Sequence, residues 1–262
     1  MLLIADNLHI MNPFVAKALQ ARDPLPFKKI AEHCTKINAY AMDINLGPLR
    51  HNKEEVITFV IEAVQDSFSG RLVLDSIQAE VIAQGIKICK QPPIINGFSL
   101  EENKLQTILP LAAEYQADIV GFLLDEQGKI PSGTEERLAV ASRLVAAAEE
   151  QGVPPEKIII DPVLVPLTWQ DGTHYNRALI ETIQLLGQVF GQPIRTIAGL
   201  SNIGAGAPDS PKRKTAEAAF IFMLAASHLD YILMNASQKS NLTAFNRSQL
   251  LLAEKVFTWQ EV

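Results

Sequence analysis

The sequence predicts an α/β fold of the closed (β/α)8 type, the TIM barrel, built as a single domain over residues 1–262. Three observations favour this fold. Eight short apolar runs rich in β-branched residues recur along the chain, amphipathic stretches separate them, and no linker or break in composition divides the sequence. Because each helical crossover returns the chain to the same edge of a sheet, we expect parallel strands, and eight such units are what a closed barrel requires.

The predicted strands are short runs of apolar and β-branched residues, a composition typical of buried strands. They are Leu2–Ala5, Tyr40–Ile44, Arg71–Leu74, Pro93–Ile95, Asp118–Leu124, Lys157–Ile160, Arg195–Leu200 and Asp230–Leu233. An open, doubly wound sheet is the alternative architecture. Against it, the first strand is not followed by Gly-x-Gly-x-x-Gly, and the chain has no Gly-x-x-x-x-Gly-Lys-Ser/Thr loop.

The stretches between the strands carry apolar residues at spacings of three and four, which indicates helices with one apolar face. In chain order they are Glu54–Phe68, Ile77–Lys90, Leu105–Gln116, Thr134–Glu150, Tyr175–Phe190, Lys214–Ser227 and Leu242–Phe257. The connection from Ala5 to Tyr40 is unusually long. Asp23-Pro24 divides it into a short helix and a longer one, because proline is favoured at a helix start.

Composition and charge exclude several classes of protein. With 48% hydrophobic and 20% charged residues, the chain can bury a sizeable core, which excludes disordered and collagen-like proteins. The 23 basic and 29 acidic residues give a net charge of −6, so binding to nucleic acid or to a membrane surface is not expected. Asp6 interrupts the first apolar run too early for a signal peptide, and no run is long enough to span a bilayer, so we expect a cytoplasmic protein. Cys34 and Cys89 lack metal-ligand spacing and no His-Glu-x-x-His occurs, so no metal site is expected.

Polar residues follow the ends of the predicted strands. They are Asp6-Asn7, the segment Asp43 to Pro48, Asp75-Ser76, Asn96-Gly97, Asp125-Glu126, Asp161-Pro162 and Ser201-Asn202. In a barrel these positions converge on the C-terminal face, where active sites of this architecture lie. Helix capping is the competing interpretation, and Asp75 is its clearest case. Capping explains one oxygen per helix, but it explains neither paired Asp and Asn residues in one loop nor Asp161 between Ile160 and Pro162, so we favour a functional role for the set.

Carboxylates and amides with few cations are suited to a neutral heterocycle that is rich in hydrogen-bonding groups. A carboxylate accepts two parallel N–H bonds from an amidine-like edge. An asparagine amide both donates and accepts, which matches a lactam edge. Reduced pterins carry both of these edges.

Five motifs carry a resemblance to a known family: Asp43-x-Asn45-x-Gly47-Pro48, Leu74-Asp75-Ser76, Ile95-Asn96, Ile160-Asp161-Pro162 and Gly199-Leu200-Ser201-Asn202. In this order and at these spacings they resemble the methyltetrahydrofolate:corrinoid-protein methyltransferases, and the resemblance spans nearly the whole chain. The wider pterin-binding superfamily includes dihydropteroate synthase and the methyltetrahydrofolate domain of cobalamin-dependent methionine synthase.

The resemblance implies an enzyme that moves a methyl group between N5 of methyltetrahydrofolate and the cobalt of a corrinoid (cobalamin) carried on a partner protein. It implies that Asp75, Asn96 and Asp161 bind the pterin ring and that Asn202 approaches N5. Further substrate-binding candidates are Asp43, Asn45, Ser201 and Arg213, the last as a match to a pterin-contacting arginine. Because tertiary N5 is a poor leaving group, it needs a proton or hydrogen bond as charge develops. Asn202 would supply the bond, and water near Asp161 or Asp75 would supply the proton.

The chain departs from the family pattern in two places. The family's first strand ends in Gly-Glu-Arg-Ile-Asn, but here it ends in Ala5-Asp6-Asn7-Leu8-His9, which keeps an acid and replaces the arginine. The loop from Gly204 to Pro211 is longer than in the family. The chain also lacks the Asp-x-His-x-x-Gly signature of cobalt-ligating corrinoid proteins, so the corrinoid must arrive on another polypeptide or free in solution.

Two other functions remain as alternatives. A dihydropteroate synthase must bind a pyrophosphate leaving group and carries Asn-x-Thr-x-Asp-Ser-Phe after its first strand, a motif that is missing here. A non-catalytic pterin-binding or docking subunit of a corrinoid complex would not need an N5 contact, so Asn202 argues against it. By resemblance we also expect a homodimer.

Overall fold

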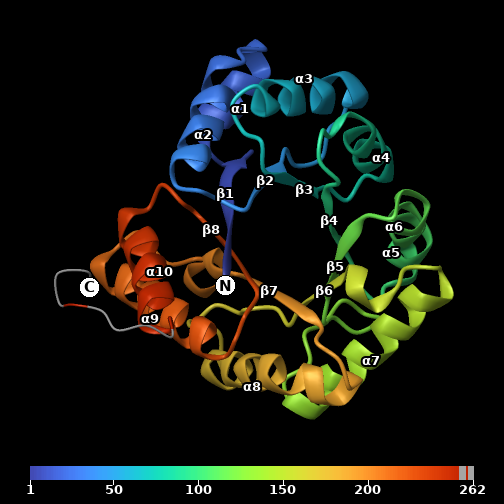
Figure 1. Ribbon diagram of the computed structural model, residues 1–262, viewed down its shortest axis with the longest axis vertical. Helices are drawn as coiled ribbons and strands as arrows, with labels where there is room; N and C mark the ends of the chain where they lie inside the picture. Colours follow the sequence, from blue (N-terminus) through green and yellow to red (C-terminus); the bar gives the residue numbers. More distant parts are fainter. Residues whose placement is uncertain (254–257, 259–262) are drawn as a thin grey trace.

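The computed structural model describes residues 1–253 and residue 258, and it confirms the predicted barrel. Eight parallel strands close into a ring in sequence order, and helices surround the ring (Figure 1). The strands are β1 Leu2–His9, β2 Ala41–Asn45, β3 Arg71–Asp75, β4 Ile94–Phe98, β5 Asp118–Phe122, β6 Ile158–Asp161, β7 Arg195–Gly199 and β8 Tyr231–Met234.

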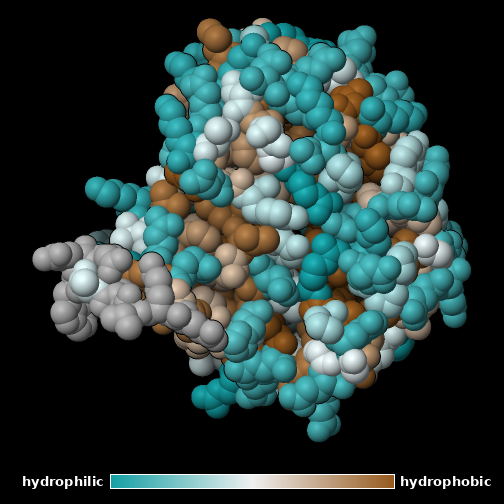
Figure 2. All heavy atoms as spheres, viewed as in Figure 1, coloured by the Kyte–Doolittle hydropathy of each residue, from teal (hydrophilic) through white to brown (hydrophobic). Residues whose placement is uncertain are grey.

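The helices follow the strands in the alternation that the sequence predicts. They are α1 Pro13–Ala21, α2 Leu25–Lys36, α3 Lys53–Gln65, α4 Ala79–Ile88, α5 Glu102–Thr107, α6 Leu109–Tyr115, α7 Thr134–Glu150, α8 Gly172–Phe190, α9 Pro211–Ala226 and α10 Lys239–Leu251, with 3-10 turns η1 Pro155–Lys157 and η2 Leu200–Gly204. None of the described helices combines the length and hydropathy that a bilayer crossing needs. On the face seen in Figure 2, polar side chains cover most of the rim where the helices lie, and apolar side chains gather in smaller areas.

Three predicted boundaries need correction. The strand expected at Leu2–Ala5 continues to His9, so Asp6 and Asn7 lie inside β1 rather than after it, within the register shift between Ala5 and Leu8. The helix expected at 105–116 is two helices, α5 and α6, because Pro110 in the first turn of α6 has no N–H to continue the ladder of α5. The last predicted helix, Leu242–Phe257, corresponds to α10, which begins earlier, at Lys239, and ends at Leu251, while residues 254–257 lie outside the described part of the chain.

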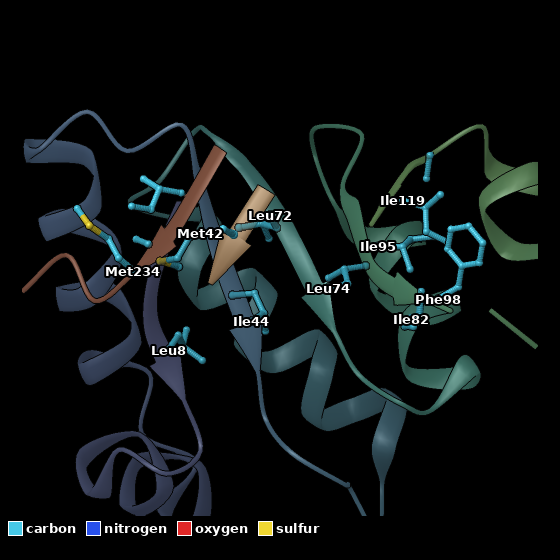
Figure 3. Close-up of a cluster of buried hydrophobic side chains, with 14 of the residues drawn as sticks. Leu8, Met42, Ile44, Leu72, Leu74, Ile82, Ile95, Phe98, Ile119 and Met234 are labelled. Carbon is cyan, nitrogen blue, oxygen red and sulfur yellow. The ribbon is translucent and has the colours of Figure 1, made fainter. Parts of the chain in front are cut away.

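The core has two layers. Inside the barrel, each strand contributes one side chain to a cluster made of Ile4, Ala41, Val73, Ile94, Val120, Ile159, Ile197 and Tyr231. Outside it, strand side chains of the opposite face pack against the helices, and Figure 3 shows part of this layer, including Leu74 of β3 and Ile82 of α4. Because successive strand residues point to opposite faces, the two layers use alternate positions of the same strands.

The N-terminal end of the barrel is closed by an ionic cluster around Asp118. Its carboxylate accepts from Arg71 Nη1 at 2.6 Å and from Arg195 Nη2 at 3.1 Å, and Lys157 Nζ lies 3.7 Å away. Burial alone would raise the pKa of Asp118, but the bonds and charges of Arg195 and Arg71 outweigh it and lower that pKa. This end of the barrel therefore serves stability rather than chemistry.

The ring is closed between the first and last strands. β1 pairs with β8 from Leu2 opposite Tyr231 to Ala5 opposite Met234. Asn7 fastens the junction, because its Nδ2 donates to Asn235 Oδ1 and Ser237 Oγ and its Oδ1 accepts from the Ala236 N–H.

Candidate functional site

The floor of the candidate site is the next inward-facing layer of the barrel. Side chains alternate along a strand, so the residue two positions beyond each inner core residue faces the same interior. Moving two residues towards the C-terminal end from that cluster gives Asp6, Asp43, Asp75, Asn96, Phe122, Asp161, Gly199 and Leu233. All of them line one cavity of about 340 Å³. Half of this layer is carboxylate, whereas the layer beneath it is almost entirely apolar.

The same cavity brings together every predicted site residue except Arg213. Asp43, Asn45, Asp75, Asn96, Asp161, Ser201 and Asn202 all line it. Three lining residues that sequence reasoning did not single out as site residues are His9, Lys104 and Phe122. Phe122 could have been predicted, because it stands at an inward-facing position of β5. His9 and Lys104 could not, because they reach the cavity from the end of β1 and from α5, and no pattern in the sequence around them indicates it.

Asp75 is held from the neighbouring strand. Asn45 Nδ2 donates to Asp75 Oδ2 at 2.7 Å, and Asn45 Oδ1 accepts from the Gly47 N–H at 3.1 Å, so the turn after β2 fixes the amide. Gly47 has φ +64°, a conformation that favours glycine. The capping interpretation of Asp75 is wrong, because α4 begins after Gln78 and has no side-chain cap. Burial raises the pKa of Asp75 to about 6, although the bond from Asn45 opposes the rise.

Asp161 is supported by a buried arginine from α7. Arg137 is fully buried, and it donates to the carbonyl oxygens of Pro131 at 2.9 Å and Pro162 at 2.6 Å. Asp161 Oδ1 accepts from the Val163 N–H at 2.7 Å, and Val163 has φ +64°, which is strained for a β-branched residue. Burial raises the pKa of Asp161 to about 7, against the lowering effect of the Val163 bond and the Arg137 charge.

The remaining two acids lie on adjacent strands. Asp43 is 2% exposed, and its Oδ1 has no hydrogen-bond partner among the described residues. Burial raises the pKa of Asp43 well above its usual range, and the charges of Asp75 and Asp6 raise it further. Burial also raises the pKa of Asp6, while His9 and a hydrogen bond with Ser201 lower it. All four acids of this layer therefore favour the neutral form more than a free aspartate does.

The β4 side of the cavity is built by close backbone contact. Asn96 lies in the floor layer and is followed by a cis peptide bond to Gly97. A Cβ on Gly97 would stand 2.3 Å from the carbonyl oxygen of Val120 on β5, so only glycine fits there. Nearby, Lys104 Nζ lies 5.8 Å from the centre of the Phe122 ring, within cation–π range.

Ser201 and Asn202 form the β7 side. Both are exposed residues of η2, which follows β7 directly. Asn202 Nδ2 would lie 3.7 Å from a Cβ placed on Gly199, which belongs to the floor layer. The Asn202 side chain therefore folds back over the floor of the cavity. The amide is thus free to contact a ligand that enters from the C-terminal face.

Arg213 lies in a neighbouring cavity of about 480 Å³ that shares Asp6, His9 and Ser201 with the first. Its Nε donates to Glu217 Oε1 at 2.7 Å, and its Nη1 donates to the Ala207 carbonyl at 3.1 Å. Glu217 is 2% exposed and also accepts from Gln238 and Asn241, each at 2.9 Å. Of the other predicted site residues, only Ser201 shares this cavity with Arg213, and most of the Arg213 guanidinium is committed to the protein.

The first cavity combines hydrogen-bond acceptors of variable protonation with amides that donate and accept. Asp75 and Asp161, with pKa values of about 6 and about 7, can gain or lose a proton near neutral pH. Such a site suits a polar heterocycle and acid–base chemistry.

Comparisons with known proteins agree with this geometry. The methylcorrinoid:tetrahydrofolate methyltransferase of Eubacterium limosum is 26% identical over 255 residues, which cover 96% of this chain and 91% of that protein. The 7,8-dihydropteroate synthase of Vibrio fischeri ES114 has a similar structure, with a TM-score of 0.68 and 18% identity over 97% of this chain and 94% of that one. A Yersinia pestis DHPS solved with a pterine-sulfa conjugate gives a TM-score of 0.70 and 16% identity with the same coverage. Residues 49–235 match the family described as pterin binding enzymes, and the chain belongs to this family.

Proposed function

We propose that this protein is a methyltransferase that moves a methyl group between N5 of methyltetrahydrofolate and the cobalt of a corrinoid carried on a partner protein. One observation carries the proposal. Carboxylates and an amide surround a cavity of about 340 Å³ at the C-terminal end of the barrel, with Asn202 over its floor. This set complements the amidine-like and lactam edges of a reduced pterin. The reaction for which the Eubacterium limosum relative is named supports the same chemistry.

Each site residue takes a role that its position allows. Asp75, Asn96 and Asp161 would hold the pterin ring from the floor, and Asn45 would keep Asp75 in place through its 2.7 Å bond. Asn202 and Ser201 would contact the ring from above. Asn202 would stabilise charge at N5 more strongly in the transition state than in the ground state, which is the condition for a gain in rate. Arg213 lines the adjoining cavity and is paired with Glu217, so no contact with the pterin ring is proposed for it.

A dihydropteroate synthase activity is disfavoured by the charge of the adjoining cavity. Pyrophosphate is a polyanion, and a site for it needs several cations or free backbone N–H groups. The described lining of this cavity contains two acids, Asp6 and Glu217, against one arginine that is already paired with Glu217. A pyrophosphate group would therefore meet excess negative charge.

The test is an anaerobic assay with free cob(I)alamin and methyltetrahydrofolate, in which loss of cob(I)alamin and formation of methylcobalamin are followed in the visible spectrum. We expect conversion by the native chain. Asn202→Ala should lower kcat by about 10²-fold or more while pterin affinity stays within about threefold, since the lost contact acts in the transition state. The matched control is Asn103→Ala, an exposed asparagine of α5 outside both cavities.

Three results would contradict the proposal. Tight pterin binding by calorimetry without conversion, even with corrinoid proteins as methyl carriers, would indicate a docking subunit. Condensation of a pterin pyrophosphate with p-aminobenzoate would indicate a dihydropteroate synthase. Absence of pterin binding would remove the ligand assignment altogether.

A further inference from the structure

Asp43 is a buried acid for which pterin binding alone gives no explanation. It lies on β2 between Asp6 of β1 and Asp75 of β3, and it lines the cavity while being only 2% exposed. Its Oδ1 receives no hydrogen bond from any described residue. An ionised carboxylate that is buried without donors carries a large desolvation cost, so something must neutralise it.

Among the residues that the structure describes, no cation on the surrounding elements is placed to do so. The charged or titratable groups that face the cavity beside Asp43 are Asp6 and His9 from β1, Asp75 from β3, Lys104 from α5 and Asp161 from β6. His9 acts on Asp6 and Asp75, and Lys104 acts on Asp75. Among residues 1–253 and 258, no group of three or more His, Cys, Asp or Glu side chains is arranged to hold a metal ion. A proton is the remaining means of neutralising Asp43.

We propose that Asp43 holds a proton at neutral pH and is the proton store of this cavity, exchanging through Asp75 and Asp6 with a basic nitrogen of the bound ligand. Geometry carries the inference: three carboxylates sit on three adjacent strands, and the most buried of them lines the cavity and has a buried oxygen without a hydrogen-bond partner among the described residues. Each ionised carboxylate disfavours ionisation of its neighbours, so the least solvated member retains a proton most readily. The raised pKa of Asp43 agrees with this assignment.

The use of the proton rests on the proposed function, whereas its presence does not. When methyltetrahydrofolate gives its methyl group to cobalt(I), the C–N bond breaks and its electron pair stays on N5. Cobalt(I) supplies the pair for the new Co–C bond, and N5 takes a proton. Asp43 would provide that proton, pass it on through Asp75 or water, and recover it from solvent. In the opposite direction N5 of tetrahydrofolate forms the bond to carbon, the Co–C pair remains on cobalt, and the N5 proton returns to the carboxylates.

Infrared spectroscopy tests the protonation without any ligand or activity. We expect a carbonyl stretching band of a neutral carboxylic acid that persists after Asp161, whose pKa is raised to about 7, has ionised. The band should be absent from Asp43→Asn and present in Asp66→Asn, an exposed aspartate whose pKa is lowered by its hydrogen bond with Lys28. In Asp75→Asn the Asp43 band should disappear at lower pH, because a negative neighbour has been removed. Titration of the native protein needs no variant, and loss of the last acid band together with the ionisation of Asp161 would overturn the proposal.

Steady-state kinetics test the use of the proton. Asn reproduces the shape of a neutral carboxylic acid but carries no transferable proton, so Asp43→Asn should keep KM for the pterin within about threefold and lower kcat by about 10²-fold. It should also remove one ionisation from the pH profile of kcat. An unchanged kcat and pH profile in a variant that has lost the acid band would overturn the role as proton store. Failure of methyl transfer in the native protein would instead refute the proposed function and leave the infrared result standing.

Discussion

Replacement of Arg137 by methionine is the sharpest test of how α7 supports the site. Methionine keeps most of the volume but removes the donors to the carbonyls of Pro131 and Pro162. Each buried carbonyl left without a partner costs about 1–3 kcal/mol, which gives roughly 2–6 kcal/mol for the pair. Part of this is offset, because burial already lowers the pKa of Arg137 to about 10 and its Nη2 has no partner among the described residues. We expect a net loss of about 2–4 kcal/mol in the free energy of unfolding.

The assay is urea unfolding followed by far-UV circular dichroism, with the slope of the transition compared between variants. The control is Arg143→Met on the same helix, whose side chain is 55% exposed and pairs with the exposed Glu126. It should change stability by about 0.5 kcal/mol or less. Because the Arg137 cation lowers the pKa of Asp161, its loss should also move the ionisation of Asp161 above about 7. If the two methionine variants are equally stable, the support of the Asp161 loop by Arg137 is refuted.

Three further predictions concern the barrel and its two ends. Gly97→Ala should lower the free energy of unfolding in urea by about 3 kcal/mol, because its Cβ would stand 2.3 Å from Val120 O. As a control, Gly187→Ala in α8 should stabilise by about 0.5–1 kcal/mol, since the nearest atom outside its own helix would be 3.8 Å from the new Cβ. Equal effects of the two changes would contradict the packing argument. Asp118→Asn should lower the free energy of unfolding by about 2 kcal/mol, because it weakens the hydrogen bonds from Arg71 and Arg195. The affinity for pterin, measured by calorimetry, should stay within about twofold. A large loss of affinity would show that the N-terminal and C-terminal ends of the barrel are coupled. The ligand-free protein should lose about 3 kcal/mol of stability as pH rises from about 4 to about 7, because the folded state, with the pKa of Asp161 raised to about 7, binds more protons than the unfolded chain. Asp161→Asn should weaken this dependence, and stability that rises over this range would contradict the burial argument.

The barrel could be predicted from the sequence because its signal is repetitive. Each strand is a compact β-branched run, and each helix carries one apolar face, so even an error at one element leaves the alternation readable. The errors occur where a single residue changes the local rule. The acid Asp6 predicted the end of the first strand. In the barrel Asp6 faces the interior at the C-terminal layer, where a charged side chain does not end the strand, and β1 continues to pair as far as His9. Pro110 divided one predicted helix into two.

Most of the candidate site could also be predicted, because the polar residues at the C-terminal strand ends share one inward register. Asp43, Asp75, Asn96 and Asp161 all stand two residues after an inner core side chain. Arg137 could not be predicted in the same way, since it reaches the Asp161 loop from a helix and its partners are backbone carbonyls. The partner of Arg213 is Glu217, one helical turn along α9, and the sequence alone does not show that Glu217 is buried.

The junction between β1 and β8 has a consequence for how the chain acquires its structure. Asn7 bonds residues 228 to 230 positions away, so the contacts that complete the ring have nearly the greatest sequence separation available. Contacts of this kind form late, because the entropy of closing so long a loop must be met before they contribute. During synthesis β1 can pair with β2 long before β8 emerges, and until then its other edge stays open to unwanted strand addition. The amino-terminal strand is therefore the first element made and the last to be completed.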